Sequence, residues 1–262
     1  MITKRGKKSQ ITLFMILGLV VLIFVVFLWY FNSLSSGVDV KVTTKSTQQL
    51  DALGVSVTSF VNSALEEATV EALINNGVQA GYYELPDNTD PISSIPFLFY
   101  YDDAYLIPRN DLEKQLGYSI DAALNAKLFG LQPFAEQGIE VFMDEPDTEI
   151  IIARDNVLVE TEMLVTITQG SASKVLKKFQ LDMPCRLGTI HDLLVEYVPM
   201  QTQDMTTICV ECLQSLTTEY DLEVQILPLD PETYAFSITD KKAFVNGSNY
   251  EFIFMSKFST FG

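Results

Sequence analysis

Cys209 and Cys212 are the residues whose type and spacing come closest to a known chemical motif. Two thiols three positions apart on a helix can close as a structural disulfide, bind zinc or cycle as a redox pair. A redox pair of the thioredoxin type follows a strand, whereas residues 205–207, Met-Thr-Thr, do not read as one. Outside the cytoplasm a disulfide is chemically reasonable. The sequence therefore favours a Cys209–Cys212 bridge, with buried free thiols as the next interpretation.

Zinc binding is a weaker interpretation of the same cysteines. A zinc site needs two further ligands, and Cys185 with His191 would complete a set of four. Such sites usually draw on two closely spaced pairs, whereas Cys185 and His191 are six positions apart. His191 is the only histidine of the chain and is expected to cap a helix or to lie on its surface. No metal or cofactor is therefore predicted.

Other catalytic patterns are missing from the sequence. It contains no nucleophile elbow, phosphate loop, dinucleotide fingerprint or EF-hand loop. Neighbouring carboxylates such as Asp102 and Asp103 are too common to indicate a site. A glycosidase needs only two carboxylates and would leave no such pattern. The sequence thus argues against an enzyme, and an anchored enzyme or solute-binding module stays as an alternative.

Residues 11–31 form a stretch of 21 residues without a charge, Pro, Asn or Gln. As a helix this stretch spans about 32 Å, which matches the hydrocarbon core of a bilayer. Four Lys and Arg residues lie at positions 4–8, so the positive-inside rule leaves residues 1–10 in the cytoplasm and the remainder beyond the membrane. The stretch is longer than the apolar core of a secretory signal peptide. We therefore expect a transmembrane helix that anchors the chain in the lipid bilayer.

The basic leader and this helix resemble those of archaeal type IV pilin-like proteins. The similarity rests on Lys7-Lys8-Ser9 followed by Gln10-Ile11-Thr12-Leu13-Phe14, and residues 4–18 also resemble the N-terminus of uncharacterised archaeal single-pass membrane proteins. The resemblance implies cleavage between Ser9 and Gln10, which leaves the helix on the mature chain. A pilin-like filament subunit is thus the alternative to a plain anchor. Asn, Ser and Gly residues at 32–37 interrupt the helix, which favours the anchor.

The chain is strongly acidic, with a net charge of −17. All 34 acidic residues but only 13 of the 17 basic ones lie beyond residue 31, which leaves that part with a charge of −21. Nucleic acid and anionic lipid would be repelled by such a charge. Apart from the bilayer, we therefore expect a protein partner or self-assembly and no nucleic acid.

The exported part reads as an α+β fold with an antiparallel sheet. A connector at 32–45, with a short strand at 38–42, leads to a mainly helical part at 46–135 and a sheet-rich part at 136–262.

The mainly helical part contains two predicted helices. The first runs over 46–76 with apolar residues at helical spacing and Gly77 as its stop signal, and the second runs over 110–129. Between the two helices, an aromatic-rich stretch predicts a strand at 97–101. Aromatics at this density could also form a carbohydrate-stacking platform, which is the alternative interpretation of this stretch.

The sheet-rich part shows the two-residue periodicity of strands. Asn246-Gly247 between its last two apolar runs is the strongest short hairpin signal. With Ser248 it also makes Asn246 an N-glycosylation acceptor, and an unmodified turn is the alternative. The predicted elements are a meander of strands at 139–143, 149–153, 157–168 and 174–183, helices at 187–198 and 208–217, and strands at 221–227, 233–238, 243–245 and 248–254.

These patterns favour a membrane-anchored cell-surface protein. Its N-terminus would be cytoplasmic, and its acidic extracytoplasmic interaction domain would have a structural or adhesive role.

Overall fold

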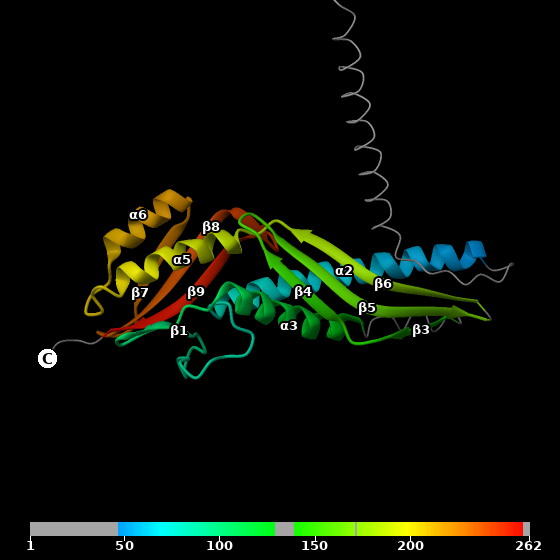
Figure 1. Ribbon diagram of the computed structural model, residues 1–262, viewed down its shortest axis with the longest axis horizontal. Helices are drawn as coiled ribbons and strands as arrows, with labels where there is room; N and C mark the ends of the chain where they lie inside the picture. The colour runs from blue at the N-terminus through cyan, green and yellow to red at the C-terminus, as the bar shows by residue number, and fades with distance from the viewer. Residues whose placement is uncertain (1–46, 129–138, 171, 259–262) are drawn as a thin grey trace, which may run out of the picture. The chain divides into compact units, whose positions relative to one another are not determined.

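The computed structural model describes residues 47–128, 139–170 and 172–258 (Figure 1). Residues 41–262 form one compact unit, which includes both parts expected beyond the connector. The described residues form an α+β fold with two largely antiparallel sheets, as the sequence predicts at that level. The predicted strand at 38–42 lies outside them. In chain order the elements are α2 (Thr47–Val78), β1 (Phe97–Tyr100), β2 (Asp103–Ala104), α3 (Arg109–Leu128), β3 (Glu140–Met143), β4 (Asp147–Ile152), β5 (Val157–Gln169), β6 (Ala172–Met183), α5 (Leu187–Gln201), α6 (Val210–Tyr220), β7 (Glu223–Pro228), β8 (Thr233–Val245) and β9 (Ser248–Lys257).

The first sheet is built around β5, which pairs with β6 on one side and with both β3 and β4 on the other. The sequence predicts that the segments at 139–143 and 149–153 flank a turn as consecutive strands of a meander. Instead, β3 and β4 lie end to end along the same edge of β5. This is possible because β5 has 13 residues, enough to pair with both short segments in succession. The meander of β4, β5 and β6 is as predicted.

The second sheet has the strand order β2-β1-β9-β8-β7. The hairpin between β8 and β9 turns at Asn246 and Gly247, whose φ angles of 54° and 75° fit a two-residue turn of type I′. β8 is one strand of 13 residues, irregular between Asp240 and Phe244, where the sequence predicts two strands. β1 pairs in parallel with β9, a long-range contact that the local pattern does not predict.

The predicted apolar face of α2 is buried, and Glu66, Glu67 and Glu71 lie on its exposed side. The helix continues past Gly77, which is therefore not a stop signal. A Cβ at Gly77 would overlap the carbonyl oxygen of Glu251 in β9, so glycine is required here for close packing of α2 on the second sheet. The left-handed residues that follow the helix are Ala80 and Gly81.

α3 covers the outer edge of β4, and its contacts satisfy backbone groups that would otherwise stay unpaired. Glu113 Oε1 accepts a hydrogen bond from the Ile152 amide at 2.9 Å, and Arg109 Nη1 donates to the Ile152 carbonyl at 3.2 Å. A Cβ at Gly117 would lie 2.7 Å from the Thr148 carbonyl oxygen, which shows how closely the helix approaches the strand. Covering the edge in this way prevents β4 from pairing with another chain.

α5 and α6 lie over β7, β8 and β9 (Figure 1). Tyr197 of α5 makes an edge contact with Phe99 of β1, with ring centroids 5.7 Å apart. Phe236 of β8 stacks on Phe254 of β9 at 4.9 Å. These four aromatic side chains are fully buried and belong to one hydrophobic core.

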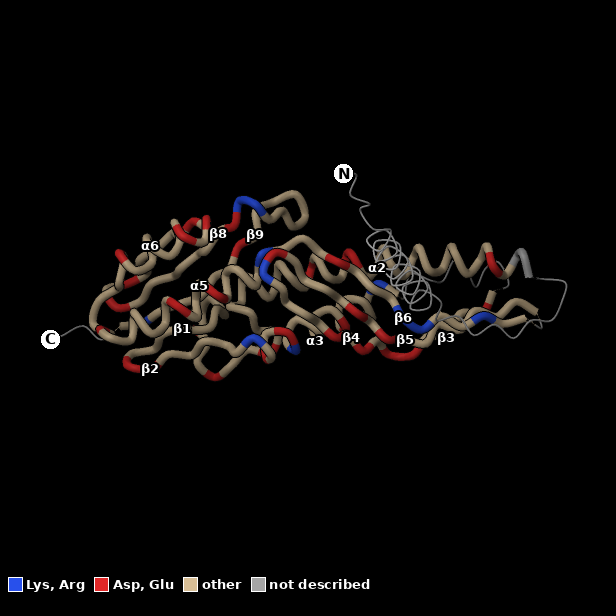
Figure 2. Tube along the Cα trace, turned by 45° about the horizontal axis from the view of Figure 1, so that its top comes forward, with Lys and Arg blue, Asp and Glu red and all other residues tan. Residues whose placement is uncertain are grey.

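Acidic residues occur along most described elements, whereas basic residues occur at fewer positions (Figure 2). On the outer face of the first sheet, Glu149 lies directly opposite Glu160. Lys178 of β6 offsets this repulsion because its ammonium lies 2.9 Å from the Glu160 carboxylate and 2.5 Å from that of Glu162. Hydrogen bonds from Lys178 and Gln180 lower the pKa of Glu160.

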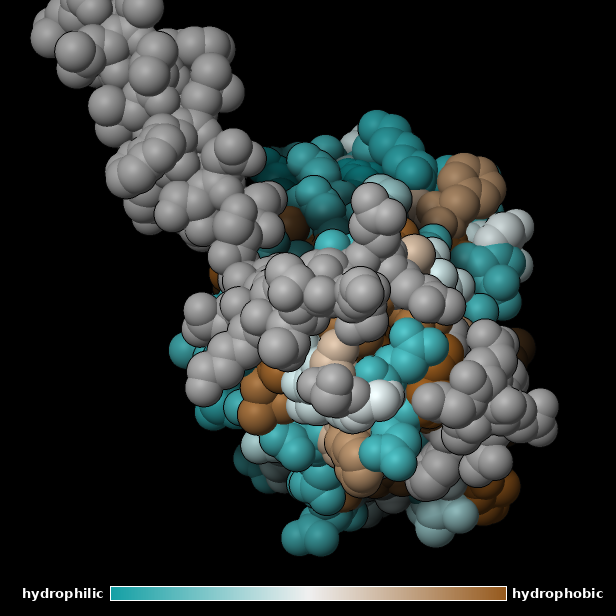
Figure 3. All heavy atoms as spheres, turned by 90° about the vertical axis from the view of Figure 1, so that its right-hand side faces the viewer, coloured by the Kyte–Doolittle hydropathy of each residue, from teal (hydrophilic) through white to brown (hydrophobic). Residues whose placement is uncertain are grey.

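Large apolar side chains are exposed on α2, β3 and β5. Val55 is 68% exposed, Phe142 66% and Leu164 43%. Figure 3 views the end of the unit that carries β3 and the start of α2, where hydrophobic residues lie among hydrophilic ones. None of the three side chains lines either of the grooves described below.

Candidate functional site

An open groove of about 800 Å³ lies beside β1 and the end of β9. Residues 87–93 form one rim and residues 229–233 contribute the other. Between the rims lie three aromatic rings, Phe97, Tyr100 and Tyr105, together with Lys257. We call this feature the tyrosine groove. Its volume is within the range of ligand sites, about 300–1,000 Å³.

Each rim is held by a turn that begins with Asp-Pro. Asp90 accepts hydrogen bonds from the amides of Ile92 and Ser93, at 3.1 and 2.7 Å. Asp230 accepts from the amides of Glu232 and Thr233, both at 2.8 Å. Both rims share the pattern Asp-Pro-x-Ser/Thr, which is a recognisable turn signal.

These hydrogen bonds keep both rim carboxylates ionised. The backbone amide of Ser93 is the main cause of a lowered pKa at Asp90, and the amide of Glu232 lowers the pKa of Asp230. The first rim is fixed further by Asn88 Nδ2, which donates to the Phe97 carbonyl at 2.8 Å. The rims are thus held by hydrogen bonds within the protein.

Two of the rings present exposed surface to the groove. Tyr100 is 37% exposed and Tyr105 39%, whereas Phe97 is buried. Phe97 supports Tyr100, with ring centroids 5.1 Å apart. The Tyr105 hydroxyl donates to Asp103 at 3.4 Å; partial loss of solvent, followed by the charge of this carboxylate, raises the pKa of Tyr105.

Lys257 is the only basic residue that lines the groove among the described residues. Its ammonium lies 5.3 Å from the ring centroid of Tyr101. A hydrogen bond to Tyr101 raises the pKa of Lys257, and the positive charge of Lys257 helps to lower the pKa of Asp90 and Asp230. The groove therefore combines aromatic faces with a fixed donor and fixed acceptors.

A second groove of about 790 Å³ lies between α3 and the strands β4, β5 and β6. Ile151 and Leu158 contribute aliphatic surface, and Glu149 and Glu160 contribute carboxylates. None of the lining residues in the part of the chain that the structure describes is aromatic. It offers neither a ring face nor a rim built by turns, so the tyrosine groove is the better candidate site.

The sequence points to part of the tyrosine groove. The aromatic-rich stretch, with its alternative as a stacking platform, contains Tyr100 and Tyr105. The strand at 97–101 is also correct to one residue. Asp230 and Lys257 were not predicted, because only the pairing of β1 with β9 brings them beside this stretch. The repeated Asp-Pro turn is the signal that could have identified the rims.

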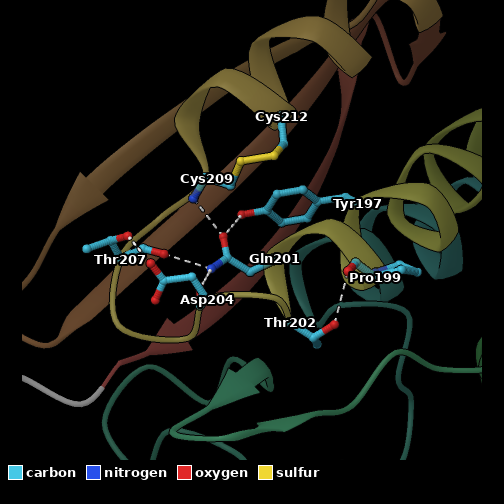
Figure 4. Close-up of a disulfide and its surroundings, with 8 residues drawn as sticks. All are labelled: Tyr197, Pro199, Gln201, Thr202, Asp204, Thr207, Cys209 and Cys212. Atoms are coloured by element: carbon cyan, nitrogen blue, oxygen red, sulfur yellow. Dashed lines mark hydrogen bonds between the residues drawn. A yellow bond between two sulfur atoms is a disulfide. The ribbon is translucent and has the colours of Figure 1, made fainter.

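The cysteine pair lies elsewhere, at the start of α6 (Figure 4). Cys209 and Cys212 form a disulfide, with their Cα atoms 5.3 Å apart. The preceding loop is held by the fully buried Gln201. Its Oε1 accepts from the Tyr197 hydroxyl and from the Cys209 amide, both at 2.8 Å, and its Nε2 donates to the carbonyls of Asp204 and Thr207. The disulfide therefore closes the first turn of α6, directly after a loop that Gln201 organises.

Replacing both Cys209 and Cys212 with serine is expected to lower the free energy of unfolding by about 2 kcal/mol, because the bridge closes a short loop. Urea unfolding of the two proteins checks this value. The matched change Cys185→Ser tests whether the effect comes from the bridge, since Cys185 is a free, buried thiol. Thiol counting in denaturant should find one reactive thiol before reduction and three after it. Three thiols before reduction would contradict the bridge.

The four residues of the zinc interpretation are not brought together as a site. No group of three or more His, Cys, Asp or Glu side chains that could hold a metal occurs among the residues that the structure describes. Cys185 is fully buried, and burial raises the pKa of its thiol to about 12. Cys209 and Cys212 are joined to each other.

His191 is buried, with 6% of its surface exposed, so the expected surface or capping position is wrong. Its Nε2 donates to the carbonyl of Ile107 at 2.9 Å, and its Nδ1 has no hydrogen-bond partner among the described residues. α5 presents this side chain to the segment before α3, on the face that also buries Leu194. Burial lowers the pKa of His191, and the positive charge of Arg109 acts in the same direction.

The free energy of unfolding is expected to fall as the pH is lowered from about 6.5, the pKa of an unfolded histidine, toward the lower pKa of His191 in the folded protein. Unfolded His191 takes up a proton in this window while folded His191 does not, so protonation favours the unfolded chain. His191→Gln should reduce the difference in unfolding free energy between pH 7.5 and pH 5.5, measured with urea. An identical difference in the variant would show that other groups cause it.

Asn246 is exposed in the turn between β8 and β9, so a glycan would have room there. The processing position at Ser9 and Gln10 and the predicted transmembrane helix at 11–31 lie outside the described residues. Within residues 47–128, 139–170 and 172–258, no helix is both long and apolar enough to cross a membrane.

No known protein family, curated protein or solved structure matches the chain.

Proposed function

We propose that the protein is anchored in a membrane by residues 11–31 and carries an acidic interaction domain on the extracytoplasmic side, with a structural or adhesive role. The observation that carries the proposal is the uncharged stretch of 21 residues behind a basic leader. The disulfide supports it, because disulfides persist in oxidising compartments. The tyrosine groove gives such a domain a preformed surface on which to bind.

Fractionation and protease access test this proposal. The full-length chain should stay in the membrane pellet after a carbonate wash, and a variant that lacks residues 11–31 should move to the supernatant. Protease added to intact cells should degrade the domain but spare an epitope tag placed on the N-terminus. Recovery of the full-length chain in the supernatant, or degradation only after lysis, would contradict the proposal.

A pilin-like filament subunit is the second candidate, favoured by the resemblance at Lys7-Lys8-Ser9 and Gln10. In that case the helix would leave the bilayer and pack with its copies. The mass of the mature N-terminus separates the two candidates. An intact leader supports the anchor, and a chain that begins at Gln10 supports the filament subunit.

A further inference from the structure

We propose that the tyrosine groove binds an uncharged saccharide, which places an apolar face on Tyr100 and Tyr105 and hydrogen-bonds to Asp90, Asp230 and Lys257. This inference deepens the proposed function and rests on it, since it names the class of ligand that the interaction domain recognises.

The aromatic rings supply the first argument. Tyr197, Tyr220 and Tyr250 are buried, but Tyr100 and Tyr105 keep more than a third of their surface exposed within one groove. Tyrosine combines an apolar ring with a polar hydroxyl, so it suits a ligand that has both kinds of surface. The C–H faces of a sugar ring stack on aromatic rings, and its hydroxyl groups lie around the edge.

Charge restricts the ligand. Asp87, Asp90 and Asp230 line the groove and outnumber Lys257, so an anionic ligand would be repelled. A purely apolar ligand would remove water from these carboxylates without replacing its hydrogen bonds, which is unfavourable.

Lys257 partly offsets the three carboxylates, so the attraction of a cationic ligand is weakened but not removed. Lys257 occupies the space above Tyr101, and its charge acts on Asp90 and Asp230. An added cation would have to compete with Lys257 for these carboxylates. An uncharged ligand with many hydroxyl groups can instead accept a hydrogen bond from Lys257 and donate to the carboxylates.

The groove is also preformed. Both Asp-Pro turns and the bond from Asn88 to Phe97 hold the rims without a ligand. Little conformational entropy is therefore lost when a ligand binds, which favours even a weak saccharide complex.

Saturation-transfer NMR with the full-length protein tests the proposal. The protein is kept in a detergent without a sugar headgroup, and cellotriose, maltotriose and triacetylchitotriose are the probes. At least one of them should receive saturation at its ring C–H protons. In the double variant Tyr100→Ala/Tyr105→Ala, the dissociation constant should rise by about tenfold or more.

Three further samples make the result specific. Tyr118→Ala removes a tyrosine that is 52% exposed on α3 and outside the groove, so binding should be unchanged. Tyr100→Phe/Tyr105→Phe keeps the rings and should retain most of the binding. Tetramethylammonium serves as a cationic probe. Thermal unfolding verifies that each variant is folded.

The proposal is overturned if no saccharide receives saturation, if binding survives the double alanine variant, or if only tetramethylammonium binds. None of these results affects the location of the protein, which the carbonate wash and protease digestion measure independently. Failure of the saccharide inference and failure of the proposed function are therefore distinguishable.

Discussion

Replacing Arg186 with methionine is expected to lower the free energy of unfolding by about 3–5 kcal/mol, because it leaves a buried carboxylate without its counter-charge. The guanidinium of Arg186 lies 3.0 Å from Asp240 Oδ1, and the Asp240 side chain is fully buried. Arg186 also donates to the Tyr220 carbonyl at 2.8 Å. It therefore links the start of α5, the end of α6 and β8. Urea unfolding at neutral pH measures the loss.

Two other variants show whether burial causes this loss. Lys178→Met removes a cation that pairs with Glu160 and Glu162 on the surface, where its side chain is 56% exposed. Such pairs contribute at most about 1 kcal/mol, so a small effect is expected. Arg186→Met combined with Asp240→Asn removes the unpaired charge and keeps the acceptor for the Lys242 amide. This double variant should be more stable than Arg186→Met alone, and equal stability would contradict the explanation.

Gly188→Ala is expected to lower the free energy of unfolding by about 3 kcal/mol, the upper part of the range for overpacking. A Cβ at Gly188 would overlap the carbonyl oxygen of Ala153 and would lie 2.8 Å from its carbonyl carbon. The start of α5 is fixed against this backbone, since Thr189 donates to the Arg154 carbonyl from both its amide and its hydroxyl. Neither backbone segment can move without breaking these bonds. Thermal and urea unfolding measure the effect.

Gly54→Ala is the matched control, because Gly54 is also a buried glycine in a helix. The atoms nearest to its added Cβ belong to the flexible end of Lys174, which can move away. Alanine also favours a helix over glycine by about 1 kcal/mol. The variant should therefore be as stable as the original protein or slightly more stable. A similar loss in both variants would show that close backbone packing is not the cause at Gly188.

Local patterns predicted most of the elements because they depend on residues close together in the sequence. The helix expected over 46–76 is α2, and the one expected over 187–198 is α5. The turn at Asn246 and Gly247 was predicted for the same reason, since these residues tolerate positive φ angles. Contacts between residues far apart in the chain could not be predicted from such local patterns. Glycine is a residue type that commonly ends helices, but Gly77 instead allows α2 to pack closely on the backbone of Glu251, which is far away in the chain.

The candidate site shows the same division. The aromatic residues of the stretch around β1 were visible as a group, and a stacking platform was one interpretation of them. Their partners Asp230 and Lys257 lie more than a hundred residues away, and no local pattern relates them to Tyr100. His191 was misplaced for a related reason. Its burial comes from the segment around Ile107, which packs on α5 only in the folded chain.

Four properties of the protein can be read from its residues in order: its acidic character, its apolar stretch at 11–31, the position of most helices and strands, and the hairpin at Asn246. These properties follow from composition and from periodicities of two to four residues. The folded chain is needed to tell which exposed rings share a groove, which carboxylate pairs with Arg186 and which glycines must lack a side chain. Each of these depends on contacts between segments that are far apart in the chain. A single sequence does not show which distant segments pair, or which of their residues lie opposite one another.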